Sequence, residues 1–236
     1  MLMKTNVKIL LFMLAVVLLS QCEKDPELEP KVTIPDNNFL NALIELGVDT
    51  NGDGVISPAE AEAITHLNVS GDSISDLTGI EKFINLVTLF CSKNQLIIVD
   101  LSTNTALTEL DFNRNQLILL DVSNNTALKR LYCNHNQLRS LVSKNSALIE
   151  LFCHDNKLNN LDVSNNATIE VLDCDENRLK NLDVSNCTAL EILHCYHNQL
   201  TSLDVSKNIT LMYLDCNVNG LNDLNVTNNN ALEYLN

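Results

Sequence analysis

The sequence has few aromatic residues and few basic ones. Tryptophan is absent, and Phe, Trp and Tyr together make up 4% of the 236 residues, so the large side chains that dominate tight protein interfaces are scarce. Lys and Arg number 15 against 30 Asp and Glu, which gives a formal net charge of −15. Nucleic-acid binding needs a basic surface, and this composition argues against it. An acidic exterior suits a solvated surface, a cationic partner or calcium.

Sequence signatures of catalysis are also missing. The chain shows no Ser/His/Asp order, no nucleophile motif and no glycine-rich phosphate loop. Each of these places a reactive group in a fixed local geometry, and without them a catalytic site has no local signal. We therefore expect a protein that is not an enzyme.

A 21-residue unit instead fills most of the chain. It reads L-x-x-L-x-C-x-x-N-x-L-x-x-L-D-V-S-x-N-x-A, and the copy from Leu128 is one residue shorter. Copies begin at Leu86, Leu107, Leu128, Leu148, Ile169, Leu190 and Leu211, and an eighth opens at Leu232. Self-similarity at this fixed period predicts a solenoid.

The positions within the unit indicate what each side chain does. Each copy should form one strand and one return, with positions 4 and 6 pointing inward and positions 3, 5 and 7 outward. Position 9 is always asparagine, whose amide can satisfy backbone groups that a turn leaves facing the core. This predicted ladder comprises Asn94, Asn115, Asn136, Asn156, Asn177, Asn198 and Asn219. The Asp and Ser of the L-D-V-S segment are expected to serve outer turns.

Cysteine occupies inward position 6 in six copies. These residues are Cys91, Cys133, Cys153, Cys174, Cys195 and Cys216, with Phe112 in the second copy. Side chains at one position of adjacent strands lie about 4.8 Å apart and point in parallel, so we expect a ladder of free, buried thiols that act as small hydrophobes. Cys187 replaces an asparagine on the return side, and we expect it to be exposed.

The first residues predict export. Lys4 and Lys8 precede an apolar run from Ile9 to Leu19, which is too short to span a bilayer and is typical of a signal peptide covering residues 1–21. The following Leu19-Ser20-Gln21-Cys22 resembles a bacterial lipobox, which implies lipidation of Cys22 and departs from the usual pattern at Gln21. Residues 22–32 are charged, contain prolines and are expected to form a flexible tether. An ordinary secreted protein is the alternative.

A calcium loop is predicted before the repeats. Residues 49–60 match the 12-residue EF-hand loop, with Gly54 at the sharp turn. The ligands would be Asp49, Asn51, Asp53, the Val55 carbonyl, Ser57 and a bidentate Glu60. Helices are expected over 37–46 and 59–64, and the loop should pin them to the first repeat as a cap over residues 33–63. We expect the calcium to be structural; a turn without metal is the alternative.

Taken together, the cap, the transitional repeat at residues 64–85 and the cysteine-bearing repeats at 86–236 resemble bacterial internalins of the cysteine-ladder type. The resemblance implies an α/β solenoid, a curved, right-handed leucine-rich repeat coil with a parallel sheet on its concave face. It further implies adhesion to a macromolecule through that face. With the lipid signal, it predicts a lipoprotein on the bacterial outer membrane or cell surface.

Outward residues vary between copies and are the candidates for partner binding. The predicted contact residues are Phe90, Tyr132, Phe152, His194, Tyr196 and Tyr213, because exposed rings are seldom kept on a plain surface. Packing along the strands is the alternative. The partner is expected to be a protein or a glycan, on another cell or in the envelope, where a structural role is the further alternative.

Histidines and carboxylates also gather on adjacent strands. The group comprises His154, Asp173, Asp175, Glu176, His194 and His197. A divalent-metal site is one interpretation of this group. The other is a polar cluster that arises by chance.

Overall fold

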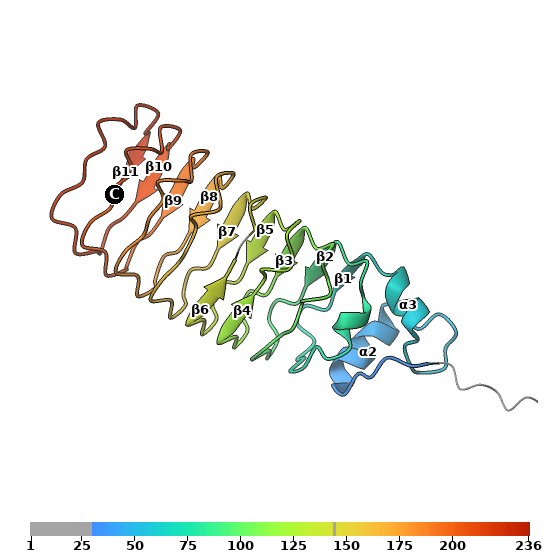
Figure 1. Ribbon diagram of the computed structural model, residues 1–236. Coiled ribbons are helices and arrows are strands. Elements are labelled where there is room, and N and C mark those ends of the chain that lie inside the picture. Colours follow the sequence, from blue (N-terminus) through green and yellow to red (C-terminus); the bar gives the residue numbers. More distant parts are fainter. Residues whose placement is uncertain (1–29, 144) are drawn as a thin grey trace, which may run out of the picture. The chain divides into compact units, whose positions relative to one another are not determined.

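The computed structural model describes residues 30–143 and 145–236, and residues 31–236 form one compact unit. The predicted signal peptide, Cys22 and all but the last three residues of the tether lie outside the described residues. Figure 1 shows the unit as a parallel-strand solenoid with helices at its N-terminal end. The predicted fold class, a leucine-rich repeat solenoid, is confirmed. Within the described residues, no helix has the length and apolar character needed to cross a membrane.

One strand from each coil builds a nine-stranded parallel sheet. Its order is β1-β2-β3-β5-β7-β8-β9-β10-β11. The bounds are β1 (His66–Asn68), β2 (Thr88–Phe90), β3 (Glu109–Asp111), β5 (Arg130–Tyr132), β7 (Glu150–Phe152), β8 (Val171–Asp173), β9 (Ile192–His194), β10 (Tyr213–Asp215) and β11 (Tyr234–Leu235). Equivalent repeat positions pair directly, as in Leu110 with Leu131. The sequence period therefore sets the register.

Each strand from β1 to β10 in this sheet is only three residues long, and its central leucine is buried. On the return side, β4 (Leu119–Asp121) and β6 (Ser140–Val142) form a second, two-stranded parallel sheet. A 3-10 turn, η1 (Ile80–Lys82), lies in the transitional repeat. One continuous apolar core runs from the cap through the coils.

The asparagines at position 9 bond to the coils on either side of them. Asn177 is typical: its Oδ1 accepts from Leu158 N at 3.0 Å, and its Nδ2 donates to the Cys153 carbonyl at 3.0 Å and the Cys174 carbonyl at 3.2 Å. The amide therefore satisfies backbone groups of its own coil and the preceding one. The same pattern recurs from Asn94 to Asn219.

A second asparagine ladder runs along the return side, where the repeat pattern predicts only outer turns. Its buried members are Asn104, Asn125, Asn145, Asn166, Asn208 and Asn229. Cys187 occupies this ladder and is fully buried, so its expected exposure is wrong. The reason is that this position faces the core, where Cys187 Sγ lies 3.6 Å from the Val163 carbonyl oxygen.

The cysteines at position 6 are buried and free, as is Cys187. Burial raises the pKa of the Cys153 thiol well above its ordinary value, and it raises the pKa of Cys187 to about 11. Such thiols remain protonated and behave as apolar side chains. The cysteine ladder is thus part of the core rather than a set of cross-links.

The cap consists of α2 (Asn37–Glu45) and α3 (Pro58–Ala63), whose bounds differ from the expected helices by one residue. Asp36 Oδ1 accepts from Asn38 N and Phe39 N at the start of α2, as an N-cap residue does. Its Oδ2 accepts from Ser75 N and Oγ, both at 2.8 Å. One carboxylate therefore caps the helix and ties it to the transitional repeat.

Helix α2 packs against the solenoid through the apolar face that carries Phe39, Ala42 and Leu43. Phe39 and Leu43 are fully buried, and the Phe39 ring lies 6.4 Å from the Phe83 ring, centroid to centroid. Leu46, by contrast, is 54% exposed. It lies at the C-cap, after which Gly47 turns the chain away with a φ of 76°.

Candidate functional site

The outward side chains of the nine-stranded sheet form the surface most suited to binding; we call it the strand face. At position 5 the paired residues run Phe90, Asp111, Tyr132, Phe152, Asp173, His194 and Asp215. All of these are partly buried. Because each strand is fixed by its neighbours and by a buried leucine, these side chains extend from a rigid base.

Two predicted contact residues stack on one another at the centre of the strand face. The rings of Tyr132 and Phe152 lie 5.3 Å apart with 25° between their planes. The Tyr132 hydroxyl donates to Glu150 Oε2 at 2.8 Å. Burial and this carboxylate raise the pKa of Tyr132 to about 12. The rings pack along the strands, as one interpretation holds, and they remain partly open to solvent.

A second aromatic group lies toward β11. Tyr213 stacks on Tyr234 with centroids 4.3 Å apart and 9° between planes, and the His194 ring lies 4.8 Å from Tyr213. Tyr196 lies beyond the strand end, 5.6 Å from the His197 ring. The predicted residues therefore form two groups, with Asp173 between Phe152 and His194 on the intervening strand β8.

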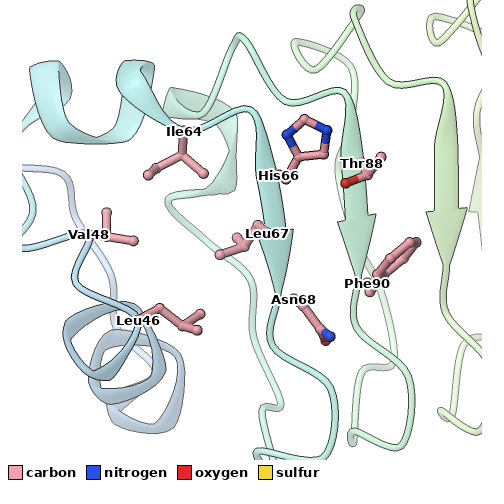
Figure 2. Close-up of a pocket in the computed structure, with 8 residues that line it drawn as sticks. All are labelled: Leu46, Val48, Ile64, His66, Leu67, Asn68, Thr88 and Phe90. Atoms are coloured by element: carbon pink, nitrogen blue, oxygen red, sulfur yellow. The ribbon is translucent and has the colours of Figure 1, made fainter.

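Phe90 lies apart from both groups, beside a hollow at the joint between cap and sheet. The hollow encloses about 390 Å³. Figure 2 shows Phe90 and Thr88 on β2 and His66 on β1, across from Leu46 of the cap. The exposure of Leu46 is thus explained by its position at this hollow. No sequence pattern marks the hollow, because it arises only where the cap meets the first strands.

Histidine and carboxylate side chains meet at the turn that follows the strands. His154 Nδ1 lies 2.7 Å from Asp173 Oδ2, and His135 Nδ1 lies 2.8 Å from Asp155 Oδ2. His194 Nδ1 is 3.9 Å from Asp175 Oδ2. His135 is not among the residues singled out from the sequence.

Burial and hydrogen bonding shift the pKa values of two residues in this group. Burial, followed by the charge of Asp173, raises the pKa of Asp175 to about 7. The hydrogen bond to Asp173 raises the pKa of His154. Of the predicted group, Asp173 and Asp175 lie next to His154 and His194. The His197 ring is exposed and packs on Tyr196 instead.

Five of the predicted calcium ligands lie in the loop between α2 and α3, and the sixth, Glu60, lies in the first turn of α3. Asp49 accepts from Gly52 N at 2.8 Å and from Gly54 N at 2.9 Å, and Asn51 Nδ2 donates to Asp53 Oδ2 at 3.0 Å. These oxygens are of the kind that calcium prefers. Val55 is partly buried at the end of the loop.

Glu60, the predicted bidentate ligand, is held by four hydrogen bonds. Its Oε1 accepts from Thr50 N and Oγ1, and its Oε2 accepts from Ser57 N and Oγ. A carboxylate has about four acceptor sites, so these donors occupy it. They also lower its pKa to about 2. Across the described residues no set of three or more His, Cys, Asp or Glu side chains converges as metal ligands.

Comparison with known proteins gives the fold a context. No protein-family model matches the chain. A 71-residue stretch, 30% of the chain, is 38% identical to Internalin J of Listeria monocytogenes serotype 4b (strain F2365), of which it covers 8%. The functional domain of InlJ from Listeria monocytogenes, which includes a cysteine ladder, matches 85% of this chain at 34% identity with a TM-score of 0.69. The chain spans 50% of that domain.

Internalin C2 of Listeria monocytogenes strain 4b F2365 shares the fold at lower identity. It matches 89% of this chain and 97% of its own at 20% identity, with a TM-score of 0.76. The chain is therefore internalin-like in its leucine-rich repeats and its cysteine ladder.

Proposed function

We propose that this chain is a non-enzymatic binding protein that holds a partner protein on its strand face. The observation that carries the proposal is the stacked pair Tyr132 and Phe152, which is partly exposed on two adjacent rigid strands. A pair already fixed by stacking and by the Glu150 hydrogen bond loses little side-chain freedom when a partner covers it. That saving favours binding.

The charges around the stacked pair favour a basic partner. Glu109 and Glu150 flank Arg130, which lies 3.9 Å and 3.4 Å from them, so one cation is shared between two acids. Asp111 and Asp173 lie on either side at position 5. Complementary charge speeds encounter and selects partners, and its effect weakens with salt.

A glycan is the alternative partner. The near-parallel rings of Tyr213 and Tyr234 favour it, because together they offer an apolar aromatic surface at one end of the strand face. Serine substitutions can remove the Tyr132–Phe152 pair and the Tyr213–Tyr234 pair separately. Comparing these variants distinguishes binding of a protein from binding of a glycan.

The test is a binding measurement against surface proteins and, in parallel, a glycan array. The double variant Tyr132→Ser with Phe152→Ser should lose protein binding, and added salt should weaken the binding of the wild type. Ile98→Ser is the matched control, because Ile98 is 71% exposed but lies on the return side of the coil. Protein binding that is equal in the double variant and the control contradicts the proposal.

For the anchor, we propose export and lipidation of Cys22, on the sequence pattern described above. Lipid chains attached at this residue would hold the protein on a bacterial membrane, and two or more chains hold far better than one. Metabolic labelling with a palmitate analogue tests this. Label that persists after Cys22→Ala rules the anchor out.

We separately propose that the cap loop binds calcium. The ion would compete for the Glu60 carboxylate with its hydrogen bonds from Thr50 and Ser57. An ion bound bidentately by Glu60 has to displace the Thr50 and Ser57 donors. Calorimetry with calcium should show binding that Asp53→Asn weakens, while the new amide oxygen keeps the contact that Asp53 Oδ1 makes with Val55 N. If Glu60→Gln lowers the melting temperature in chelator and calcium gives no heat, the loop is closed by hydrogen bonds alone.

A further inference from the structure

We propose that His135 and His154 form a two-histidine site for a divalent transition-metal ion such as zinc. The two side chains come from adjacent coils, one repeat apart in the solenoid. Their Nε2 atoms lie 3.4 Å from each other. Each ring is about one-third exposed, so an ion can reach the pair from solvent.

The carboxylates determine which nitrogen of each ring carries a proton. His135 Nδ1 faces Asp155 Oδ2 at 2.8 Å, and His154 Nδ1 faces Asp173 Oδ2 at 2.7 Å. An ionised carboxylate only accepts hydrogen bonds, so Nδ1 must be the donor in both rings. In a neutral imidazole the other nitrogen, Nε2, then has a bare lone pair.

The two rings are nearly perpendicular, at 89°, and two bare lone pairs this close repel unless a cation lies between them. N–H donors usually lie about 2.7–3.2 Å from an oxygen acceptor, and the two Nε2 atoms, at 3.4 Å, are at the long limit for a direct hydrogen bond. Zinc binds imidazole nitrogen at about 2.0–2.1 Å with tetrahedral angles, which places two such nitrogens about 3.3–3.4 Å apart. The observed separation therefore matches the spacing that the metal requires.

The carboxylates also supply the outer shell that metal-binding histidines have. A ligating histidine commonly donates its other N–H to a carboxylate, which fixes the ring and makes its free nitrogen more basic. Here both histidines have that partner. Asp173, whose side chain is only 13% exposed, is held more firmly than Asp155, so we expect it to orient its ring more strictly.

Two protein ligands leave the remaining coordination positions open. Because the described residues offer no third converging ligand, water or a side chain of a bound partner would complete the ion's coordination. The site lies at the end of strands β5 and β7, which carry Tyr132 and Phe152. A metal held there would add a cation next to the acidic strand face.

Calorimetry with Zn²⁺ tests the proposal, using the Cys22→Ser protein in excess calcium so that neither the terminal thiol nor the cap loop competes. We expect one Zn²⁺ per chain. His135→Gln and His154→Gln should each weaken binding at least tenfold, and Asp173→Asn should weaken it about 10–100-fold. His197→Gln is the matched control, because His197 occupies the same repeat position as His135 with a similar φ and should bind as the wild type does.

A second measurement separates loss of ligands from loss of fold. In NMR spectra, Zn²⁺ should shift the ring resonances of His135 and His154 together and leave those of His197 unchanged. The variants should keep the wild-type melting temperature in the absence of metal. The proposal is overturned if Zn²⁺ gives no heat, or if binding survives unchanged in His135→Gln and His154→Gln.

Discussion

At the scale of single residues, the turn at position 8 imposes a backbone conformation that most side chains avoid. The seven residues there have φ between 49° and 57°. They are Lys93, Arg114, His135, Asp155, Glu176, His197 and Val218. The left-handed region costs an L-residue roughly 1–2 kcal/mol, and asparagine tolerates it better than most. Val218 is the least suited, because its side chain is β-branched.

Val218→Asn should therefore stabilise the protein. We expect a gain of about 1 kcal/mol in the free energy of unfolding, because the strain is relieved and Val218, at 49% exposure, loses little packing. Urea unfolding of variant and wild type measures it. Met212→Asn, in ordinary backbone nearby, is the control. An unchanged or lower stability for Val218→Asn contradicts the account.

Asp175 shows how burial changes the charge of one side chain. Its pKa of about 7 lies above the value near 3.8 expected for the unfolded chain, so the folded protein holds the proton more tightly. The unfolded state therefore binds fewer protons between these values, and stability falls as pH rises from about 4 to about 7.

Asp175→Asn should remove this loss. The variant should match the wild type near pH 4 and exceed it above pH 7, since an amide oxygen can still accept the Tyr196 N hydrogen bond. Asp204→Asn is a control of opposite sign, because hydrogen bonds from Ser206 lower the pKa of Asp204. Unfolding curves at pH 4, 6 and 8 measure both. A stability difference for Asp175→Asn that does not vary with pH would count against the raised pKa.

At the scale of elements, the two asparagine ladders use their amides differently. Asn177 both donates and accepts within buried backbone. Asn208 donates to the Val184 and Cys187 carbonyls at 2.9 and 2.8 Å, but its buried Oδ1 has no partner in the described residues. Five of the six buried return-side asparagines have an unpaired Oδ1, and only Asn145 accepts there, from Ser143 Oγ. This ladder therefore depends mainly on N–H donors, which explains how Cys187 can occupy it.

Cysteine should be tolerated in one ladder and not in the other. Asn177→Cys leaves a buried N–H and several carbonyls unpaired, and we expect it to cost about 3 kcal/mol or more. Asn208→Cys leaves only carbonyl groups unpaired, with no unpaired N–H, and it removes the unpaired Oδ1 acceptor. Its cost in the free energy of unfolding should therefore be smaller by about 1–2 kcal/mol. Chemical unfolding of the two variants makes the comparison. Equal costs would mean that the two ladders play the same role.

At the scale of the whole molecule, stability comes from stacking of coils rather than from covalent cross-links. Each coil contacts its neighbours through buried leucines, amides and thiols, as expected for a quasi-one-dimensional fold. The seven cysteines in the described part of the chain are free and buried. Their burial keeps them protonated and out of reach of solvent.

The melting temperature should therefore not change when a reductant is added. A thiol reagent should leave the seven described cysteines unmodified in the native protein and should modify all of them in denaturant, because burial protects them until the coils separate. Mass spectrometry of the Cys22→Ser protein counts the modified thiols. A melting temperature that falls with reductant, or rapid native labelling of Cys174, would show that the ladder is not the closed core described.

The sequence by itself determined the repeat, the register and the inward ladders. A 21-residue period fixes which residues pair across strands, and the alternation of a strand fixes which side they face. The position-9 asparagines and position-6 cysteines could thus be placed from the repeat pattern alone. The cap could be placed as well, because its helices and loop are local patterns.

Only the tertiary structure decided the contacts between coils that depend on side-chain direction. The pairing of His135 with His154, the burial of Cys187 and the hollow beside Phe90 arise between residues about 19 to 24 positions apart or between the cap and a strand. Glu60 is a local example: its motif predicts a metal ligand, and only the structure shows that its oxygens accept hydrogen bonds from Thr50 and Ser57. The period specifies where each backbone lies, whereas rotamers and hydrogen-bond partners are set by the packed surroundings.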